Sequence, residues 1–397
     1  MSRAARPKQF LPLTGPTSLF QQTLRRVADT RYTPAVIITN SDYRFIVGEQ
    51  ASELGVELGG VLLEPVARNT AVAIAAAYIV ERFGPDAVIH VLPSDHQVTA
   101  DEGYWLAVDQ AVQAASEDKL FTFGIRPTHP ETGFGYIKSD ATVGGSARAV
   151  ERFVEKPDSD RATQMLGEGG YLWNSGMFML DAGRFLAEAE RLAPATHQAA
   201  VNSVKHARAD LDFIRLDEDA FAQAPNISVD YAIFEQTDRA AVVAVDFSWS
   251  DLGSWDAVWR SSEHDPSGNV IQGQVTLAET SNSLVISDYA HVAVNGLDDV
   301  TVIATNDAVY AGRLSQGQKV GDMDKHLRIG ETSGLTDIQH TAYRPKGVIP
   351  RSSMEFVSRP CRVPSSYARS SACKSTIAVP HTVSSWAIRS KLQRTLR

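Results

Sequence analysis

The sequence predicts an α/β protein in which a mostly parallel β-sheet, covered by helices on both faces, precedes a small all-β module. Over the first half of the chain, short β-branched runs alternate with segments of helical periodicity, an order typical of such sheets. From about residue 268 to residue 315, short strands instead follow one another with turn residues between them and no helix. That pattern is typical of a sandwich edge or a short β-solenoid.

The individual elements follow from these two patterns. Strands are expected at 35–40, 61–64, 87–92, 120–124 and 241–246, and helices near 43–54, 71–83 and 104–116. In the all-β module, strands are expected at 270–271, 274–277, 283–286, 291–294 and 300–303. Asn69 and Thr70 stand where they would cap the Ala-rich helix, with a side-chain oxygen accepting a first-turn N–H. The predicted domains are therefore 1–262, 263–335 and 336–397.

The last of these segments has a different composition. From residue 346 to the end, eleven serines and scattered arginines show no sustained period of 2 or 3.6. We therefore expect a linker and a disordered basic tail outside the core, whose deletion would change little. A basic interaction arm is the alternative, disfavoured by the lack of a dense charge block.

Charge and cysteine content limit the classes of function. The 397 residues carry a formal net charge of −9. Residues 346–397 hold ten Lys and Arg against one acidic residue, so the preceding residues carry −18. An acidic body argues against non-specific nucleic-acid binding, and no apolar run approaches the roughly 18 residues of a membrane span. With no secretory signal and both cysteines in the tail, we expect a cytoplasmic protein with no nucleic-acid or membrane partner.

Two aspartates stand at the ends of predicted strands. Asp95 follows the run 87–92 in LPSDH, and Asp251 follows the run 241–246 in SWSDLGSW. The carboxyl ends of parallel strands meet at the ligand-binding edge of a sheet, and Mg²⁺ is commonly held by one or two carboxylates together with substrate phosphates. A single aspartate in such a place is more often a turn or capping residue. As a pair, the two are candidate ligands of Mg²⁺.

Five further polar or small residues are candidates for substrate binding. In FVEKP, Lys156 would neutralise a phosphate while Glu155 accepts a sugar hydroxyl, or the two form an exposed ion pair of little energetic value. In GFGYI, Gly135 allows close approach of a ligand to the backbone, or forms a tight turn. In YLWNSGMF, Asn174 and Ser175 interrupt an apolar strand and must either satisfy backbone groups or bind hydroxyls.

Two segments carry candidates for binding an anion. In EPVARNT, Arg68 and Asn69 precede a helix N-terminus, which favours anions; simple capping is the alternative. In RPKQF, Lys8 lies in a basic, proline-fixed loop that enters an apolar turn. It is either a surface charge near the terminus or a phosphate ligand.

Eight segments, in this order, resemble those of the bacterial mannose-1-phosphate guanylyltransferases, the long type often fused to a mannose-6-phosphate isomerase domain. The match covers about residues 2–345, and its segments are PKQFLPL, EPVARNTA, LPSDH, GFGYI, FVEKP, YLWNSGMF, SVDYAIFE and SWSDLGSW. The resemblance implies a nucleotide-sugar transferase (Rossmann-like) mixed sheet followed by a left-handed β-helix-like module. It also implies a reaction in which GTP and mannose 1-phosphate form GDP-mannose and pyrophosphate.

The resemblance implies a role for each candidate residue. Asp95 and Asp251 would hold Mg²⁺, and Lys8 would contact the phosphates of GTP. Glu155 and Lys156 would bind mannose and its phosphate. The remaining candidates would line the sugar pocket (Gly135, Asn174, Ser175) or lie near the nucleotide (Arg68, Asn69).

The chain departs from the family pattern at both ends. The family opens with an apolar strand and a loop of the form GGxGTRLWPLSR, and Met1-Ser2-Arg3 aligns with its last three residues. We therefore expect the strand and its phosphate-cradling loop to be missing, with impaired activity and exposed strand edges as consequences. Tyr343-Arg344-Pro345 resembles the start of the isomerase domain, and a frameshift near residue 345 would explain why nothing after it does. Isomerase activity is not expected.

Several interpretations stay open. The chain could use another nucleotide or sugar 1-phosphate, because the segments support the reaction class better than the identity of the base. It could also be a degenerate relative that binds a nucleotide sugar without turnover or serves as an assembly partner. Whether it forms a homo-oligomer is likewise open.

Overall fold

The computed structural model describes residues 7–115, 117–142, 145–306, 308–320 and 323, and the backbone of three further strands at 341–344, 347–350 and 384–389. The chain forms two compact units. The larger comprises residues 12–252 and 382–397, and the smaller comprises residues 1–11 and 253–381.

The described helices are mostly short. They are α1 (Leu19–Val27), α2 (Arg44–Glu53), α3 (Ala71–Phe83), α4 (Glu102–Ala115), α5 (Ser159–Glu168), α6 (Ala182–Leu192), α7 (Pro194–Lys205), α8 (Glu218–Ala222) and α9 (Trp255–Arg260). Short 3₁₀-helices are η1 (Lys8–Phe10), η2 (Ser41–Tyr43) and η4 (Leu314–Lys319), and η3 (Asp230–Phe234) is a π-helical turn.

The strands of the larger unit are β1 (Thr33–Asn40), β2 (Leu58–Glu64), β3 (Val88–Pro93), β4 (Gln97–Val98), β5 (Leu120–Ile125), β6 (Tyr136–Lys138), β7 (Arg148–Ala149), β8 (Arg152–Val154), β9 (Tyr171–Asp181), β10 (Arg208–Asp210), β11 (Phe213–Arg215), β12 (Ala240–Val245), β13 (Trp249–Ser250) and β20 (Ser384–Arg389). The smaller unit holds β14 (Val270–Ala278), β15 (Leu284–Asn295), β16 (Val300–Ala304), β17 (Val309–Arg313), β18 (Thr341–Arg344) and β19 (Gly347–Pro350).

A mixed sheet organises the larger unit. Its strand order is β10-β11-β2-β1-β20-β3-β9-β5-β12-β7, and β6 and β8 extend it from β9. Pairing is parallel between β2 and β1 and between β5 and β12, whereas β9 runs antiparallel to both β3 and β5. This architecture confirms the predicted α/β fold class and the mixed sheet that the resemblance implies. The expectation of a mostly parallel sheet is wrong, because β9 and β20 run antiparallel to the strands on either side of them.

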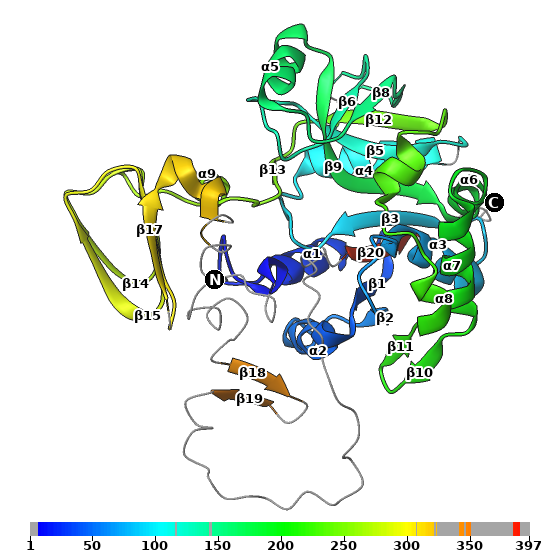
Figure 1. The fold of residues 1–397 in the computed structure, drawn as a ribbon, viewed down its shortest axis with the longest axis horizontal. Helices are drawn as coiled ribbons and strands as arrows, with labels where there is room; N and C mark the ends of the chain where they lie inside the picture. Colours follow the sequence, from blue (N-terminus) through cyan, green and yellow to red (C-terminus); the bar gives the residue numbers. More distant parts are fainter. Residues whose placement is uncertain are drawn as a thin grey trace, which may run out of the picture. The chain divides into compact units, whose positions relative to one another are not determined.

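Alternation along β3 shows that helices cover both faces of the sheet. Ile89 and Val91 belong to a core that includes the apolar sides of α3, α6 and α7, and Figure 1 shows these helices grouped on one side of the strands. His90 lies between them and therefore faces the opposite side. There its ring stacks with that of Tyr104 on α4, with centroids 6.4 Å apart.

The N-terminus of α3 differs from the prediction. Thr70 is its N-cap, but neither it nor any other side chain makes a capping hydrogen bond there. The ψ angle of Thr70 is 7°, away from the extended conformation in which a cap residue directs its oxygen at the first-turn amides. The other end follows expectation, because Gly84 closes α3 with φ at 88°, a conformation that glycine adopts at little cost.

The smaller unit contains a four-stranded sheet in the order β14-β15-β16-β17. The first three strands are parallel and β17 is antiparallel to β16. Stacked parallel strands joined by turns are consistent with the predicted β-helix-like module. The sequence pattern predicts two short strands where the structure has one longer strand, in both β14 and β15.

The tail differs from the prediction in one respect. The sequence predicts a segment outside the core after residue 345, but residues 384–389 form β20 at the centre of the large sheet. β18 and β19 pair with each other as an antiparallel hairpin. Among the described residues, no helix is both long and apolar enough to span a bilayer.

We expect Gly273→Ala to destabilise the β14–β15 sheet. Gly273 has φ at +86°, and a Cβ atom there would collide with the carbonyl oxygen of Ser287. The substitution should lower the free energy of unfolding by more than about 1 kcal/mol, as measured by urea denaturation. Gly48→Ala is the control, because no atom lies within 4 Å of its added Cβ and alanine favours the helix. A Gly273→Ala chain as stable as the parent would contradict this account.

Candidate active site

A short β-ribbon brings the two predicted carboxylates together. β13 pairs antiparallel with β4, and Ser250 lies opposite Gln97. Asp251 follows Ser250 directly. If the antiparallel register continues, Asp251 lies opposite His96, the residue after Asp95. The two aspartates thus lie at the same end of this two-stranded ribbon although about 150 residues separate them in the sequence.

The surroundings of Asp95 suit a hard cation. Asp95 is 6% exposed, and its Oδ1 lies 3.8 Å from Nε2 of His96. Carboxylate oxygens are the ligands that Mg²⁺ prefers, usually in company with substrate phosphates. Among the described residues, no group of three or more His, Cys, Asp or Glu side chains could by itself enclose a metal. An ion held by Asp95 and Asp251 would need further ligands, which substrate phosphates could supply.

A second group of candidates surrounds the backbone of Gly135. The carbonyl oxygen of Gly135 accepts a hydrogen bond from the backbone N–H of Asn174 at 2.8 Å. A Cβ atom on Gly135 would lie 2.5 Å from Oε2 of Glu155 and 3.5 Å from Cβ of Asn174. Only glycine leaves room here for the Glu155 carboxylate. The structure thus brings together Gly135 and Asn174, which are predicted to line the sugar pocket, and Glu155, which is predicted to bind mannose.

Hydrogen bonds from three elements fix the side chain of Asn174. Its Nδ2 donates to Oδ1 of Asp230 at 2.8 Å. Its Oδ1 accepts from Oγ1 of Thr122 and from the N–H of Gly176, both at 3.2 Å. These contacts use one of the two N–H donors that an Asn amide carries, which leaves the other for a ligand oxygen. Asn174 is therefore oriented before any ligand arrives.

Asp230 adds a proton-binding group to this cluster. Its pKa is raised to about 6, mainly by burial and then by the negative charges of Glu155 and Glu235, against the opposing hydrogen bond from Asn174. Asp230 opens η3, and π-helical turns are frequent at functional sites. Its carboxyl group therefore changes charge close to neutral pH.

Lys156 and Ser175 take different positions. Lys156 has φ at 43°, and its side chain is 65% exposed with Nζ 3.5 Å from Oε1 of Glu155. Its ammonium can still reach an anion.

Ser175 is 0% exposed, and its Oγ accepts the N–H of Met177 at 3.2 Å. The Ser175 hydroxyl thus satisfies a backbone amide of its own strand.

Trp249 connects the carboxylate pair with the sugar cluster. Its ring meets that of His96 edge-on at 5.4 Å between centroids, and that of Phe134 at 5.2 Å. His96 follows Asp95, and Phe134 precedes Gly135. One aromatic side chain thus joins the two halves of the candidate site.

The segment from Glu64 to Thr70 leaves polar atoms unused. Burial raises the pKa of Glu64 to about 7. Glu64 Oε1, Arg68 Nε and Thr70 Oγ1 are buried without a hydrogen-bond partner in the part of the chain that the structure describes. Asn69 has φ at 57°, and its Nδ2 donates to Oδ1 of Asn226 at 3.0 Å. Unsatisfied buried groups at the carboxyl end of β2 are consistent with a ligand-binding segment.

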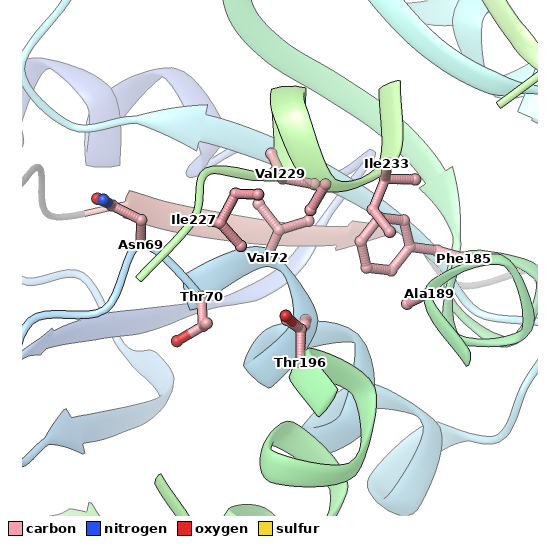
Figure 2. Close-up of a pocket in the computed structure, with 11 residues that line it drawn as sticks. Asn69, Thr70, Val72, Phe185, Ala189, Thr196, Ile227, Val229 and Ile233 are labelled. Atoms are coloured by element: carbon pink, nitrogen blue, oxygen red, sulfur yellow. The ribbon is translucent and has the colours of Figure 1, made fainter. Parts of the chain in front are cut away.

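A small pocket lies beside this segment at the N-terminus of α3. Figure 2 shows apolar side chains from α3, α6 and the η3 region around it, together with the hydroxyl groups of Thr70 and Thr196. Its lining offers no charged group to a phosphate. We therefore do not assign the nucleotide to this pocket.

Lys8 lies outside the larger unit. It opens η1 in the smaller unit, after Pro7 in an extended conformation. The other nine candidate residues all belong to the larger unit. A role for Lys8 in phosphate binding stays a prediction.

Comparisons with known proteins show the family of this chain. The family described as "Nucleotidyl transferase" matches residues 1–268. A mannose-1-phosphate guanylyltransferase of Sinorhizobium fredii is 50% identical over 351 residues, which cover 87% of this chain and 69% of the relative. The chain belongs to this guanylyltransferase family.

Other relatives extend the comparison. A xanthan biosynthesis protein of Xanthomonas campestris is 42% identical over 87% of this chain and 74% of its own length. A crystal structure from Thermus thermophilus, described as a mannose-1-phosphate geranyltransferase, superposes with a TM-score of 0.71 and 31% identity. That match covers 82% of this chain and 94% of the other. The guanylyltransferase fold therefore extends through most of the present chain.

Two residues of the candidate site are not among those predicted from the sequence of this guanylyltransferase family member. Asp230 lies in SVDYAIFE, a segment that carries the resemblance but no local chemical signature. Glu64 stands at a strand end, yet only its burial reveals the raised pKa. A carboxylate placed within or directly after apolar residues is the signal that could have found both.

The pKa of Asp230 predicts how its substitution changes stability with pH. The folded-state pKa of about 6 exceeds the reference value of 3.8, so the folded chain binds the proton more tightly. This stabilising contribution is full below the unfolded-state pKa and is lost as the pH rises through about 6. Asp230→Asn keeps an acceptor for Asn174 but cannot ionise. Its stability relative to the parent should therefore rise between about pH 4 and about pH 6 and then level off.

Urea denaturation across this pH range measures the effect. Asp238→Asn is the control, because Asp238 is 90% exposed and should leave the pH profile of the parent unchanged. A difference between Asp230→Asn and the parent that does not vary with pH would show that Asp230 does not titrate in this way.

Proposed function

We propose that this chain transfers the guanylyl group of GTP to mannose 1-phosphate, with GDP-mannose and pyrophosphate as products. The relative named for this activity supports the proposal through 50% identity. The observation that carries it in this chain is the cluster of Gly135, Glu155 and Asn174, joined through Trp249 to the carboxylate pair. Relatives named for xanthan and alginate biosynthesis further suggest that the product supplies polysaccharide synthesis.

The chemistry requires positioning more than proton transfer. A phosphate oxygen of the sugar phosphate forms a bond to the α-phosphorus of GTP. The bond from that phosphorus to the oxygen bridging to the β-phosphate breaks, and its electron pair leaves with pyrophosphate. The attacking phosphate is largely dianionic at pH 7, because its second pKa is near 6. The protein therefore needs to align the reactants and offset their charge.

The sugar cluster would align mannose 1-phosphate. The Glu155 carboxylate would accept a mannose hydroxyl beside Gly135, and the remaining amide N–H of Asn174 would donate to a sugar oxygen. The exposed ammonium of Lys156 would neutralise the attached phosphate. Ser175 would contribute by holding the backbone of β9 in place.

The nucleotide side rests on fewer contacts. Asp95 and Asp251 would hold Mg²⁺, which when bound would offset charge on the phosphate oxygens. Arg68 and Asn69 would lie near the nucleotide. Lys8 would contact the phosphates of GTP. The absence of cysteine before residue 361 is in keeping with a reducing compartment such as the cytoplasm.

Pyrophosphate release from GTP and mannose 1-phosphate with Mg²⁺ tests the proposal directly. ATP and glucose 1-phosphate replace each substrate in parallel reactions. Release that requires both GTP and mannose 1-phosphate would support the proposed reaction. Preference for a substitute would favour a transferase of different specificity. Binding of GDP-mannose without any release would favour the degenerate relative.

We expect Asp251→Asn to lower turnover by at least about 100-fold, because the neutral amide is a much weaker ligand of Mg²⁺. Mn²⁺ binding followed by electron paramagnetic resonance provides a readout that does not depend on turnover, and it should weaken in the same variant. Asp246→Asn is the control, since Asp246 is an exposed acid that follows the neighbouring strand β12. Unchanged turnover and Mn²⁺ binding in Asp251→Asn would refute the metal role.

We expect Gly135→Ala to impair use of the sugar phosphate selectively. Its Cβ would displace the Glu155 carboxylate, lowering kcat/KM for mannose 1-phosphate by about 10- to 100-fold with little change in KM for GTP. Gly133→Ala is the matched control, because its Cβ meets only the end of the Glu131 side chain at 3.3 Å. Equal losses for both substrates would indicate general misfolding instead.

A further inference from the structure

The large sheet contains a position that a distant segment fills. β20 lies between β1 and β3 and runs antiparallel to both, so β1 and β3 are parallel to each other. Figure 1 shows β20, at the red end of the colour scale, among the blue and cyan strands of the first hundred residues. Its six residues all pair with β3.

β1 and β3, the two neighbours of β20, need a hydrogen-bonded strand between them. Val36 and Ile37 of β1 are 0% exposed, as are Ile89 and Leu92 of β3. Without a strand between them, β1 and β3 would lie about two strand spacings apart, or roughly 10 Å. The N–H and C=O groups facing the gap would then lose their partners in the middle of the core, and each group that stays buried would destabilise the folded sheet.

We propose that residues 384–389 are a sheet-completing segment, and that the chain's own C-terminal region must occupy this position for the site to form. The part of the proposal that concerns activity rests on the function proposed above. The part that concerns the sheet stands independently of it.

The register connects the segment with the site. Ser384 pairs with Pro93 at the end of β3, two residues before Asp95. Ser384 also pairs with Ile38 near the end of β1. The first residue of β20 therefore holds the carboxyl ends of both neighbours at the edge that carries the predicted metal ligand. Loss of the segment would release the loop after β3 as well as the core.

Hydrogen exchange of the intact chain tests the pairing first. Alternate N–H groups of a strand point to opposite neighbours, so β1 and β3 need β20 to protect every second amide. We expect slow exchange at all amides of 36–38 and 89–92. An alternating pattern, with every second amide exchanging quickly, would overturn the proposal. Profiles that are equal at low and high protein concentration would support the chain's own segment, whereas protection that appears only at high concentration would identify a second copy as its source and overturn that assignment.

Removal and replacement of the segment provide the second test. A chain ending at His381 should lose protection at 36–38 and 89–92 and melt at a lower temperature, while β5 and β12 keep their protection. A synthetic peptide of residues 382–397 should restore both properties. A truncated chain that keeps full protection without the peptide would contradict the inference.

Point variants address the case in which the truncated chain does not fold. Ala387→Pro removes a backbone donor from the middle of β20 and should lower the melting temperature, whereas Leu396→Pro, outside the paired register, should not. Equal melting temperatures would overturn the proposal. Protected β1 and β3 in a chain that releases no pyrophosphate would instead count against the proposed function alone.

Discussion

The hydrogen bonding of Asn174 within β9 is the constraint on which the rest of the site depends. β9 pairs with β3, β5 and β6, so it cannot move without disturbing the sheet. A polar amide in such a strand must be satisfied, because a buried donor left without a partner costs about 1–3 kcal/mol. Thr122 and Asp230, which lie on other elements, form hydrogen bonds with this amide. The element that stabilises the sheet thereby also orients the group offered to the sugar.

An acidic edge is an unfavourable place for a polyphosphate unless cations accompany it. Two unit charges about 5 Å apart interact by about 3 kcal/mol at an effective dielectric constant near 20. Asp95 is nearly buried, and burial already raises the pKa of Glu64 to about 7. A divalent cation at Asp95 and Asp251, together with Lys156, would offset this negative charge. The proposal of Mg²⁺ therefore follows from the charge of the substrates as much as from the residue types.

The sequence predicts the features of this fold that repeat locally. Alternating β-branched and helical patterns locate the main strands and α3. Polar residues directly after or within apolar runs make Asp95, Glu155 and Asn174 candidates for the site. Local patterns cannot predict features that depend on contacts between residues far apart in the sequence. The role of Asp230 depends on a contact 56 residues away, and β20 depends on two strands roughly 300 residues earlier in the chain. The composition of the tail predicts a segment outside the core because no local period indicates a strand whose partners are so remote.

The two halves of the site differ in how far they are formed before substrate binds. On the sugar side, the Asn174 amide already makes its hydrogen bonds, and Glu155 already lies against Gly135. Such preorganisation lowers the entropy lost on binding and fixes the attacking group. On the nucleotide side, Glu64 and Arg68 hold buried atoms with no partner in the described structure. Those atoms are placed to exchange hydrogen bonds with a polar ligand that enters there. This asymmetry favours a sugar phosphate held in a rigid pocket and a nucleotide whose arrival completes the site.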